Sequence, residues 1–170
     1  MTPSPGFDGI PLLHGSGPIH ASCVAIDNRA VLIMGPSGSG KSDLCLRLID
    51  RGALLVSDDY TAVRRDEGSG HVIASPPATI AGKMEIRGLG VISLPYATAM
   101  PVAAAVLLVG GHGDGAIERL PLEPEYLRLC DRDIPLIRLN AFEASAPLKL
   151  EYALRASALA ARVAGPEGKE

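Results

Sequence analysis

A glycine-rich stretch of eight residues carries the clearest chemical pattern in the chain. It runs Gly35-Pro36-Ser37-Gly38-Ser39-Gly40-Lys41-Ser42 and fits G-x-x-x-x-G-K-[ST] at every position. In such a loop the glycines let consecutive backbone N–H groups point into one concavity. The lysine reaches the outer phosphates of a nucleotide, and the serine hydroxyl ligates Mg²⁺. The stretch therefore predicts a site for a nucleoside triphosphate with Mg²⁺.

Two adjacent aspartates, Asp58 and Asp59, follow the apolar segment 53–57. Phosphoryl transfer needs one carboxylate for the proton of the nucleophile and another oxygen group near the metal. Neighbouring side chains leave a strand end in different directions, so such a pair can divide these roles. The alternative interpretation is a simple turn that closes the strand, which is common for aspartate.

The stretch Glu85-Ile86-Arg87-Gly88-Leu89-Gly90 is a further candidate. Its glutamate could ligate a metal and its arginine could pair with a phosphate. A surface ion pair before a glycine turn explains the same residues equally well.

Two single residues complete the candidate set. His20 precedes the strand that leads into the glycine-rich loop and could lie on the hairpin partner of that strand, near the phosphates, although a lone strand histidine is more often structural. Arg119 follows the glycine-rich segment 110–115, so its side chain could swing over a transferring phosphoryl group; the alternative is a solvated arginine.

The strands and helices expected around these residues must position them. Apolar, β-branched residues 30–34 predict a strand before the loop, and residues 41–51 predict a helix after it. Further expected strands cover 19–27, 53–57, 60–65, 70–74, 91–94, 102–109 and 134–139, with a turn at 27–29 and helices at 123–129 and 148–163. Strands alternating with few helices predict one α/β P-loop domain with a mixed sheet. We expect a loose lead-in at 1–18, the domain at 19–164 and a frayed tail at 165–170.

The composition narrows the class of protein. A chain of 170 residues with a formal net charge of −3 gives no support for binding nucleic acid or an anionic membrane. Its three cysteines are far apart and lack C-x-x-C spacing, which favours reduced cytosolic thiols. No signal peptide is visible, and the longest apolar run, 102–109, is too short to span a bilayer. We expect a cytoplasmic protein.

The same motifs resemble the catalytic domain of bacterial HPr kinase/phosphorylase. They are His20, the 35–42 loop, Val56-Ser57-Asp58-Asp59 and Glu85-Ile86-Arg87-Gly88-Leu89-Gly90-Val91-Ile92; this last run is similar to the signature of that family. The likeness covers residues 19–142. It implies an ATP-dependent kinase of a serine on HPr, the phosphocarrier of the sugar phosphotransferase system. It also implies a fold akin to phosphoenolpyruvate carboxykinase and a homo-oligomer, commonly a hexamer.

The resemblance also implies a role for each matching residue. Asp59 corresponds to the base that takes the serine proton, and His20 to a histidine beside the two aspartates. Lys41 would hold the β- and γ-phosphates, with Ser42 and Glu85 as Mg²⁺ ligands. Arg119 resembles the catalytic arginine of the family.

Three departures from the family pattern affect these expectations. Only 19 residues precede His20, which resembles short α-proteobacterial versions without the amino-terminal domain. The stretch 95–101 is shorter than the usual insertion, and residues 139–147 do not match the segment used for phosphorolysis of phosphoserine. We therefore expect kinase activity with weak or missing phosphorylase activity.

Two alternatives to a protein kinase remain open. A small-molecule kinase would also place acidic residues after the second strand, but it normally has an arginine-rich lid, and residues 110–116 hold no arginine. A nucleotide-gated sensor would bind ATP without transferring phosphate to any serine.

Overall fold

Nine strands form one mixed sheet in the computed structural model, which describes residues 15–110, 117 and 123–163. The central path of the sheet runs β1 (Gly17–His20), β5 (Tyr60–Arg65), β6 (Val72–Ser75), β9 (Met100–Leu108), β3 (Arg29–Met34), β2 (Ser22–Ile26) and β4 (Leu54–Ser57). β11 (Arg132–Leu139) also pairs with β9 and carries β10 (Glu125–Leu129) at its other edge. Only the β3–β9 and β9–β11 pairs among these are parallel. The expected mixed α/β architecture is confirmed.

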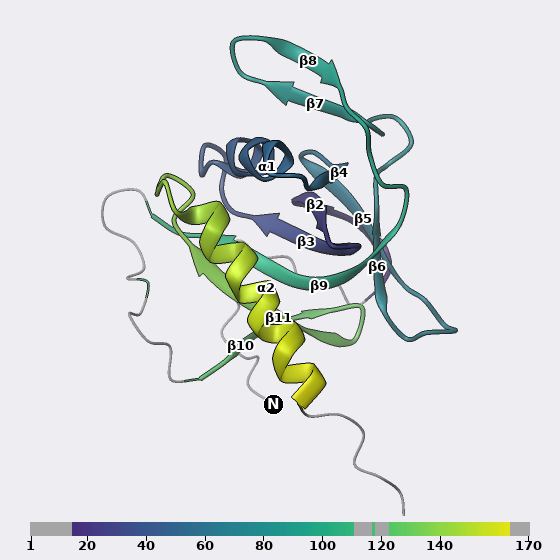
Figure 1. Cartoon of the computed structure of the whole chain (residues 1–170). Coiled ribbons are helices and arrows are strands. Elements are labelled where there is room, and N and C mark those ends of the chain that lie inside the picture. Colours follow the sequence, from purple (N-terminus) through teal and green to yellow (C-terminus); the bar gives the residue numbers. More distant parts are fainter. Residues whose placement is uncertain (1–14, 111–116, 118–122, 164–170) are drawn as a thin grey trace, which may run out of the picture.

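Two helices, α1 (Lys41–Asp50) and α2 (Ala146–Val163), pack on one face of this sheet (Figure 1). β3 is buried on both faces, so alternate residues serve different layers. Val31 and Ile33 join the cluster that includes helix residues such as Leu44, whereas Leu32 faces the opposite cluster with side chains from β1, β5 and β10. The sheet around the P-loop is thus held from both sides.

Two tight hairpins show how the local sequence sets the connections. Asp27 and Asn28 both have positive φ, 49° and 59°, and join β2 to β3 as the sequence predicted. Cys130 and Asp131, with φ of 48° and 58°, make the same kind of turn between β10 and β11.

The helix expected over 123–129 is therefore wrong, because residues 125–129 form β10. Its side chains alternate between core and solvent: Leu127 and Leu129 are buried, while Tyr126 and Arg128 are exposed. A period of two suits a strand that covers one face of a core, and pairing with β11 satisfies its backbone. The short segment taken by itself does not indicate that β11 is its partner strand.

The expected strand 19–27 is divided at Ala21. β1 pairs with β5, whereas β2 pairs with β3 and β4. His20 therefore ends β1, opposite Tyr60, and does not lie on the hairpin partner of the P-loop strand. The remaining expected strands and the closing helix are present, with bounds that differ by a few residues.

A separate two-stranded hairpin, β7 (Lys83–Ile86) and β8 (Gly90–Ser93), extends beyond α1 (Figure 1). Met84 anchors it in the helix-side core with 1% of its surface exposed. The candidate motif that begins at Glu85 thus forms the end of β7, a glycine-containing turn and the start of β8.

Several expectations concern residues outside the described ranges. These are most of the lead-in 1–18, most of the glycine-rich segment 110–115, Arg119 and the tail 165–170. Neither α1 nor α2 combines the length and hydrophobicity needed to cross a bilayer.

Candidate active site

The glycine-rich loop joins the end of β3 to the start of α1, as its sequence predicted. Gly38 and Gly40 have φ of 79° and 93°, values that side chains with a Cβ rarely adopt. A Cβ on Gly40 would also lie only 2.8 Å from the Cβ of Ala141. Glycine is needed at position 40 both for the turn and for this close approach.

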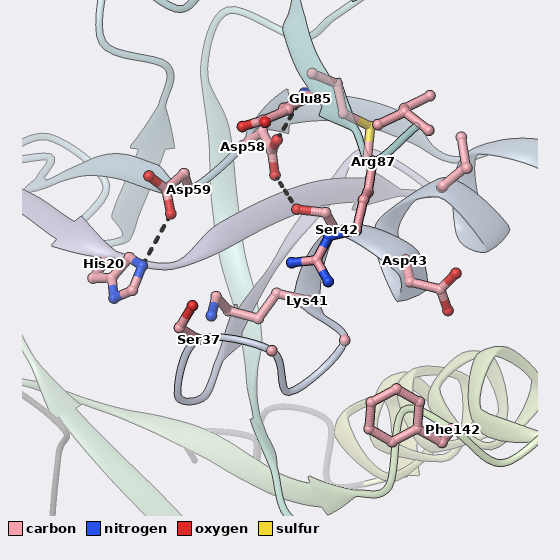
Figure 2. A pocket seen from close by; sticks show the side chains of 15 residues that line it. His20, Ser37, Lys41, Ser42, Asp43, Asp58, Asp59, Glu85, Arg87 and Phe142 are labelled. Carbon is pink, nitrogen blue, oxygen red and sulfur yellow. Dashed lines mark hydrogen bonds and ion pairs between the residues drawn. The ribbon is translucent and has the colours of Figure 1, made fainter. Parts of the chain in front are cut away.

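Lys41 lies over the loop that it follows. Its Nζ donates hydrogen bonds to the carbonyl oxygens of Gly35 at 2.9 Å and Pro36 at 3.0 Å. The residue is 8% exposed, so most of its stem is packed and the ammonium group faces the cleft (Figure 2). Phosphate oxygens are stronger partners for an ammonium group than neutral carbonyls are. The lysine is therefore held at the place where an outer phosphate could take over these contacts.

The remaining loop residues divide into two groups. Ser37, Gly38, Gly40 and Ser42 line the cleft together with Lys41, whereas Gly35, Pro36 and Ser39 do not. The Ser39 hydroxyl is buried without a hydrogen-bond partner among the described residues.

Asp58 is the centre of a buried hydrogen-bond network at the end of β4. Its Oδ1 accepts hydrogen bonds from the hydroxyls of Ser42 at 2.9 Å and Ser22 at 3.1 Å. Its Oδ2 accepts one from the backbone N–H of Glu85 at 3.2 Å. One carboxylate thus connects the P-loop helix, β2 and the β7–β8 hairpin.

Asp59 points away from this network toward His20 (Figure 2). The Nε2 of His20 lies 3.0 Å from Oδ1 of Asp59, and the Asp59 side chain is 63% exposed. The register of β1 and β5 puts His20 opposite Tyr60, whose ring centroid is 5.2 Å from the imidazole. Asp59 itself has a φ of 68°, an uncommon value for a residue other than glycine. The local turn at Asp59 and the long-range pairing of β1 with β5 together determine the position of the Asp59 carboxylate.

These groups share one open cleft of about 600 Å³. Figure 2 shows His20 and Asp59 at one end, Lys41 and Ser42 in the middle, and Asp43 and Phe142 at the other end. Figure 2 also shows the guanidinium group of Arg87 turned toward the P-loop from the β7–β8 hairpin. The hairpin therefore brings a positive charge to the phosphate site that the loop sequence predicts.

The described residues contain no group of three or more His, Cys, Asp or Glu side chains that could hold a metal by themselves. Ser42 and Asp58 nevertheless present oxygen atoms 2.9 Å apart, and Glu85 lines the same cleft. Few protein oxygens suit Mg²⁺, which keeps waters and shares phosphate oxygens of a nucleotide. The donor set fits Mg²⁺ delivered with a nucleotide.

The cysteines take no part in this chemistry. Cys23, Cys45 and Cys130 are free and buried, as expected for core residues. Burial raises the pKa of the Cys45 thiol, and the nearby charge of Asp58 raises this pKa further. A thiol with a raised pKa is a poor nucleophile at neutral pH.

Several residues of the site were missed in the sequence, among them Ser22, Arg47 and Phe142. Ser22 is a small polar residue within an apolar strand, a signal that could have been noticed. Arg47 donates hydrogen bonds to the backbone carbonyls of Ala141 and Glu143, and Phe142 lies between them. No pattern in the neighbouring sequence indicates the contacts of Arg47 or the position of Phe142. Arg119 lies outside the described residues, so its expected place remains a prediction.

Comparison with known proteins places the chain in a family. Residues 13–150 match the family model described as the HPr Serine kinase C-terminal domain. The chain is 35% identical over 130 residues to an HPr kinase/phosphorylase of Chlorobium luteolum, which covers 72% of this chain and 39% of the relative. An HPr kinase/phosphorylase of Brevibacillus brevis is 35% identical over 126 residues, covering 70% and 40%. The chain thus spans about two fifths of the length of these curated relatives.

A solved structure, described as the Hpr(Ser) kinase/phosphatase from Coxiella burnetii, has the same fold. It superposes with a TM-score of 0.73 and 28% sequence identity, covering 85% of this chain and 92% of that one. The family match spans the P-loop, the Asp58–Asp59 pair and the β7–β8 hairpin, which together form the cleft. The chain therefore belongs to the family of the HPr Serine kinase C-terminal domain.

Proposed function

We propose that this chain is an ATP-dependent protein kinase that phosphorylates a serine of the phosphocarrier protein HPr. The observation that carries the proposal is the His20–Asp59 pair, which opens on the same cleft as Lys41 and Ser42. An exposed carboxylate beside a phosphate-binding loop can meet a hydroxyl group that belongs to another protein. The names of the relatives support HPr as that protein.

The proposed reaction transfers the γ-phosphoryl group of ATP to the serine oxygen. Asp59 accepts the proton of the serine hydroxyl as the oxygen–phosphorus bond forms, and the bond from the γ-phosphorus to the bridging oxygen breaks. ADP leaves with the electron pair of that bond. His20, 3.0 Å from the carboxylate, orients Asp59 for this proton transfer.

Two side chains, Lys41 and Arg87, supply the positive charge that neutralises the phosphates of ATP. Lys41 would exchange its two carbonyl partners for the β- and γ-phosphates, and the guanidinium of Arg87 would neutralise charge from the hairpin side. Ser42 and Glu85, with Asp58 behind the serine, would hold Mg²⁺. The ion would neutralise charge that develops on the phosphate oxygens.

We further propose that the chain acts in the cytoplasm as a homo-oligomer, as the resemblance implies, and that phosphate-dependent removal from phosphoserine-HPr is weak or missing.

The decisive experiment incubates the protein with Mg-ATP and HPr and locates any phosphate by mass spectrometry. We expect one phosphate on one serine of HPr, and far less of this product in the same incubation time when Asp59→Asn replaces the wild type. ATP binding without any transfer would favour a nucleotide-gated sensor. ATP turnover that needs a small hydroxyl compound instead of HPr would favour a small-molecule kinase.

A further inference from the structure

The cleft has chemically different ends. One end holds the His20–Asp59 pair, whereas Phe142 borders the opposite end, beyond Asp43 (Figure 2). Leu46 and Ile86 add apolar side chains to the lining of the cleft. A nucleoside triphosphate has the same division, because its terminal phosphate is charged and its base is a flat, weakly polar ring.

Phe142 is an exposed aromatic residue, with 63% of its surface accessible. It lies between β11 and α2, in a segment whose backbone is held in several places. Arg47 donates hydrogen bonds to the carbonyls on both sides of it, those of Ala141 and Glu143, and the N–H of Phe142 donates to Oδ1 of Asn140 at 3.0 Å. Glu143 is tied in turn to Lys149 of α2. The ring faces solvent on a well-anchored backbone.

The ring also lies against the P-loop. A Cβ on Gly40 would be 3.6 Å from both Cε1 and Cζ of Phe142. Since Gly40 immediately precedes Lys41, this aromatic ring adjoins the start of α1, where the loop would hold phosphates. With the γ-phosphate directed to Asp59, the ribose and base must leave the loop at the opposite end, which is the end that Phe142 borders.

We propose that Phe142 is the stacking platform for the nucleobase of the bound triphosphate, and that Arg47 is the positioning residue that fixes this platform. The inference rests on the proposed nucleotide-dependent function and deepens it. Offset stacking covers apolar ring surface that is otherwise left in water. Because every base has a π-face, a stacking platform without base-edge contacts tolerates different bases. The site should bind ATP and GTP with similar affinity.

The first test compares two ligands that differ only in having a nucleoside. Phe142→Ala should raise the Kd of Mg-ATP about tenfold, the loss expected for one base–aromatic stack. The Kd of inorganic tripolyphosphate should stay unchanged, because the P-loop is intact. Phe142→Tyr should bind ATP like the wild type. Tyr126→Ala, which removes an exposed aromatic ring from β10, is the matched control and should change neither Kd.

A second test uses fluorescence, since the chain contains no tryptophan. Phe142→Trp should show quenched emission with ATP or GTP and no change with tripolyphosphate, whereas Tyr126→Trp should respond to none of them. For the positioning residue, Arg47→Lys and Arg47→Ala should weaken ATP binding and leave tripolyphosphate binding intact, with the conservative variant weakened less.

Clear outcomes would overturn the platform. Unchanged ATP affinity in Phe142→Ala contradicts it, and equal weakening of ATP and tripolyphosphate would mean that Phe142 supports only the loop. A raised KM for HPr alone would assign the ring to the protein substrate. ATP binding by the wild type and quenching in Phe142→Trp, found together with no phosphorylation of HPr, would overturn the kinase proposal but keep the platform.

Discussion

The side chains of Asp58 and Asp59 diverge at the end of β4 and reach different partners. Asp58 is 7% exposed and accepts hydrogen bonds from Ser42, Ser22 and the backbone of Glu85. Asp59 is open to solvent and contacts His20. A carboxylate saturated by donors suits a structural or metal-side role, while an accessible one suits proton transfer. This difference in exposure and hydrogen bonding supports Asp59 as the base.

Asp59→Asn should lower the rate of phosphate transfer by about 10²- to 10⁴-fold, the usual contribution of a general base. The amide keeps the shape of the carboxylate but cannot accept the serine proton, so the Kd of ATP should remain near the wild-type value. Turnover and nucleotide affinity are measured on the same preparations. A normal rate in Asp59→Asn together with a lost rate in Asp58→Asn would reverse the two roles.

Lys41→Ala should weaken Mg-ATP binding by about 1.5–3 kcal/mol, the range for a hydrogen bond to a charged group, and should abolish transfer. No other residue of the P-loop carries a positive charge. Arg128→Ala removes an exposed cation from β10 and should change neither quantity. Wild-type turnover in Lys41→Ala would remove the P-loop from the mechanism.

Local pattern explains which parts of this site could be predicted. The P-loop, its strand and its helix depend on consecutive residues, so their sequence was sufficient. The contact between His20 and Asp59 depends on β1 pairing with β5, far along the chain, and only the family resemblance placed the two together. Phe142 was missed because its approach to Gly40 depends on how the segment after β11 packs on α1. Residues 125–129 form a strand because they pair with β11, a contact that the short segment by itself does not indicate.

Removal of divalent metal should stop the reaction. Activity should vanish in EDTA and return with Mg²⁺ or Mn²⁺, because Ser42 and Glu85 offer oxygen ligands that suit either ion. Glu85→Gln should need more Mg²⁺ for half-maximal activity. Glu67→Gln, on the exposed turn between β5 and β6, should need the same concentration as the wild type. Full activity in the chelator would contradict the assignment.

The ion pair between Arg51, the C-cap residue of α1, and Glu151 of α2 should make the free energy of unfolding depend on pH. Nε and Nη2 of Arg51 donate to the carboxylate of Glu151 at 2.8 and 2.7 Å, and this bonding lowers the pKa of Glu151 below its ordinary value of 4.5. The stabilisation is therefore complete above about pH 4.5 and is lost as the pH falls through the lowered pKa.

Glu151→Gln should consequently reduce the thermal midpoint at pH 7, and its difference from the wild type should shrink as the pH falls below 4.5. Thermal unfolding followed by circular dichroism across this range measures the effect. Glu67→Gln controls for the loss of one negative charge. A difference that stays constant with pH would mean that the ion pair does not contribute.

Phosphate-dependent removal of phosphate from phosphoserine-HPr should be much slower than the forward reaction. In that reaction an oxygen of inorganic phosphate attacks the phosphoserine phosphorus, Asp59 returns a proton to the serine oxygen, and pyrophosphate leaves. The attacking phosphate must be bound and deprotonated where the γ-phosphate lay. Residues 139–147, which do not match the phosphorolysis segment that the family resemblance implies, contain no lysine or arginine that could hold it.

Both directions can be measured on one preparation, with serine phosphorylation followed by mass spectrometry and phosphorolysis by release of pyrophosphate. We expect a clear forward rate and little or no pyrophosphate. Saturating inorganic phosphate should not restore the reverse rate, because the segment lacks a cation to orient the nucleophile. Equal forward and reverse rates would mean that the attacking phosphate is bound without a cation from residues 139–147, and the inference from that segment would then be wrong.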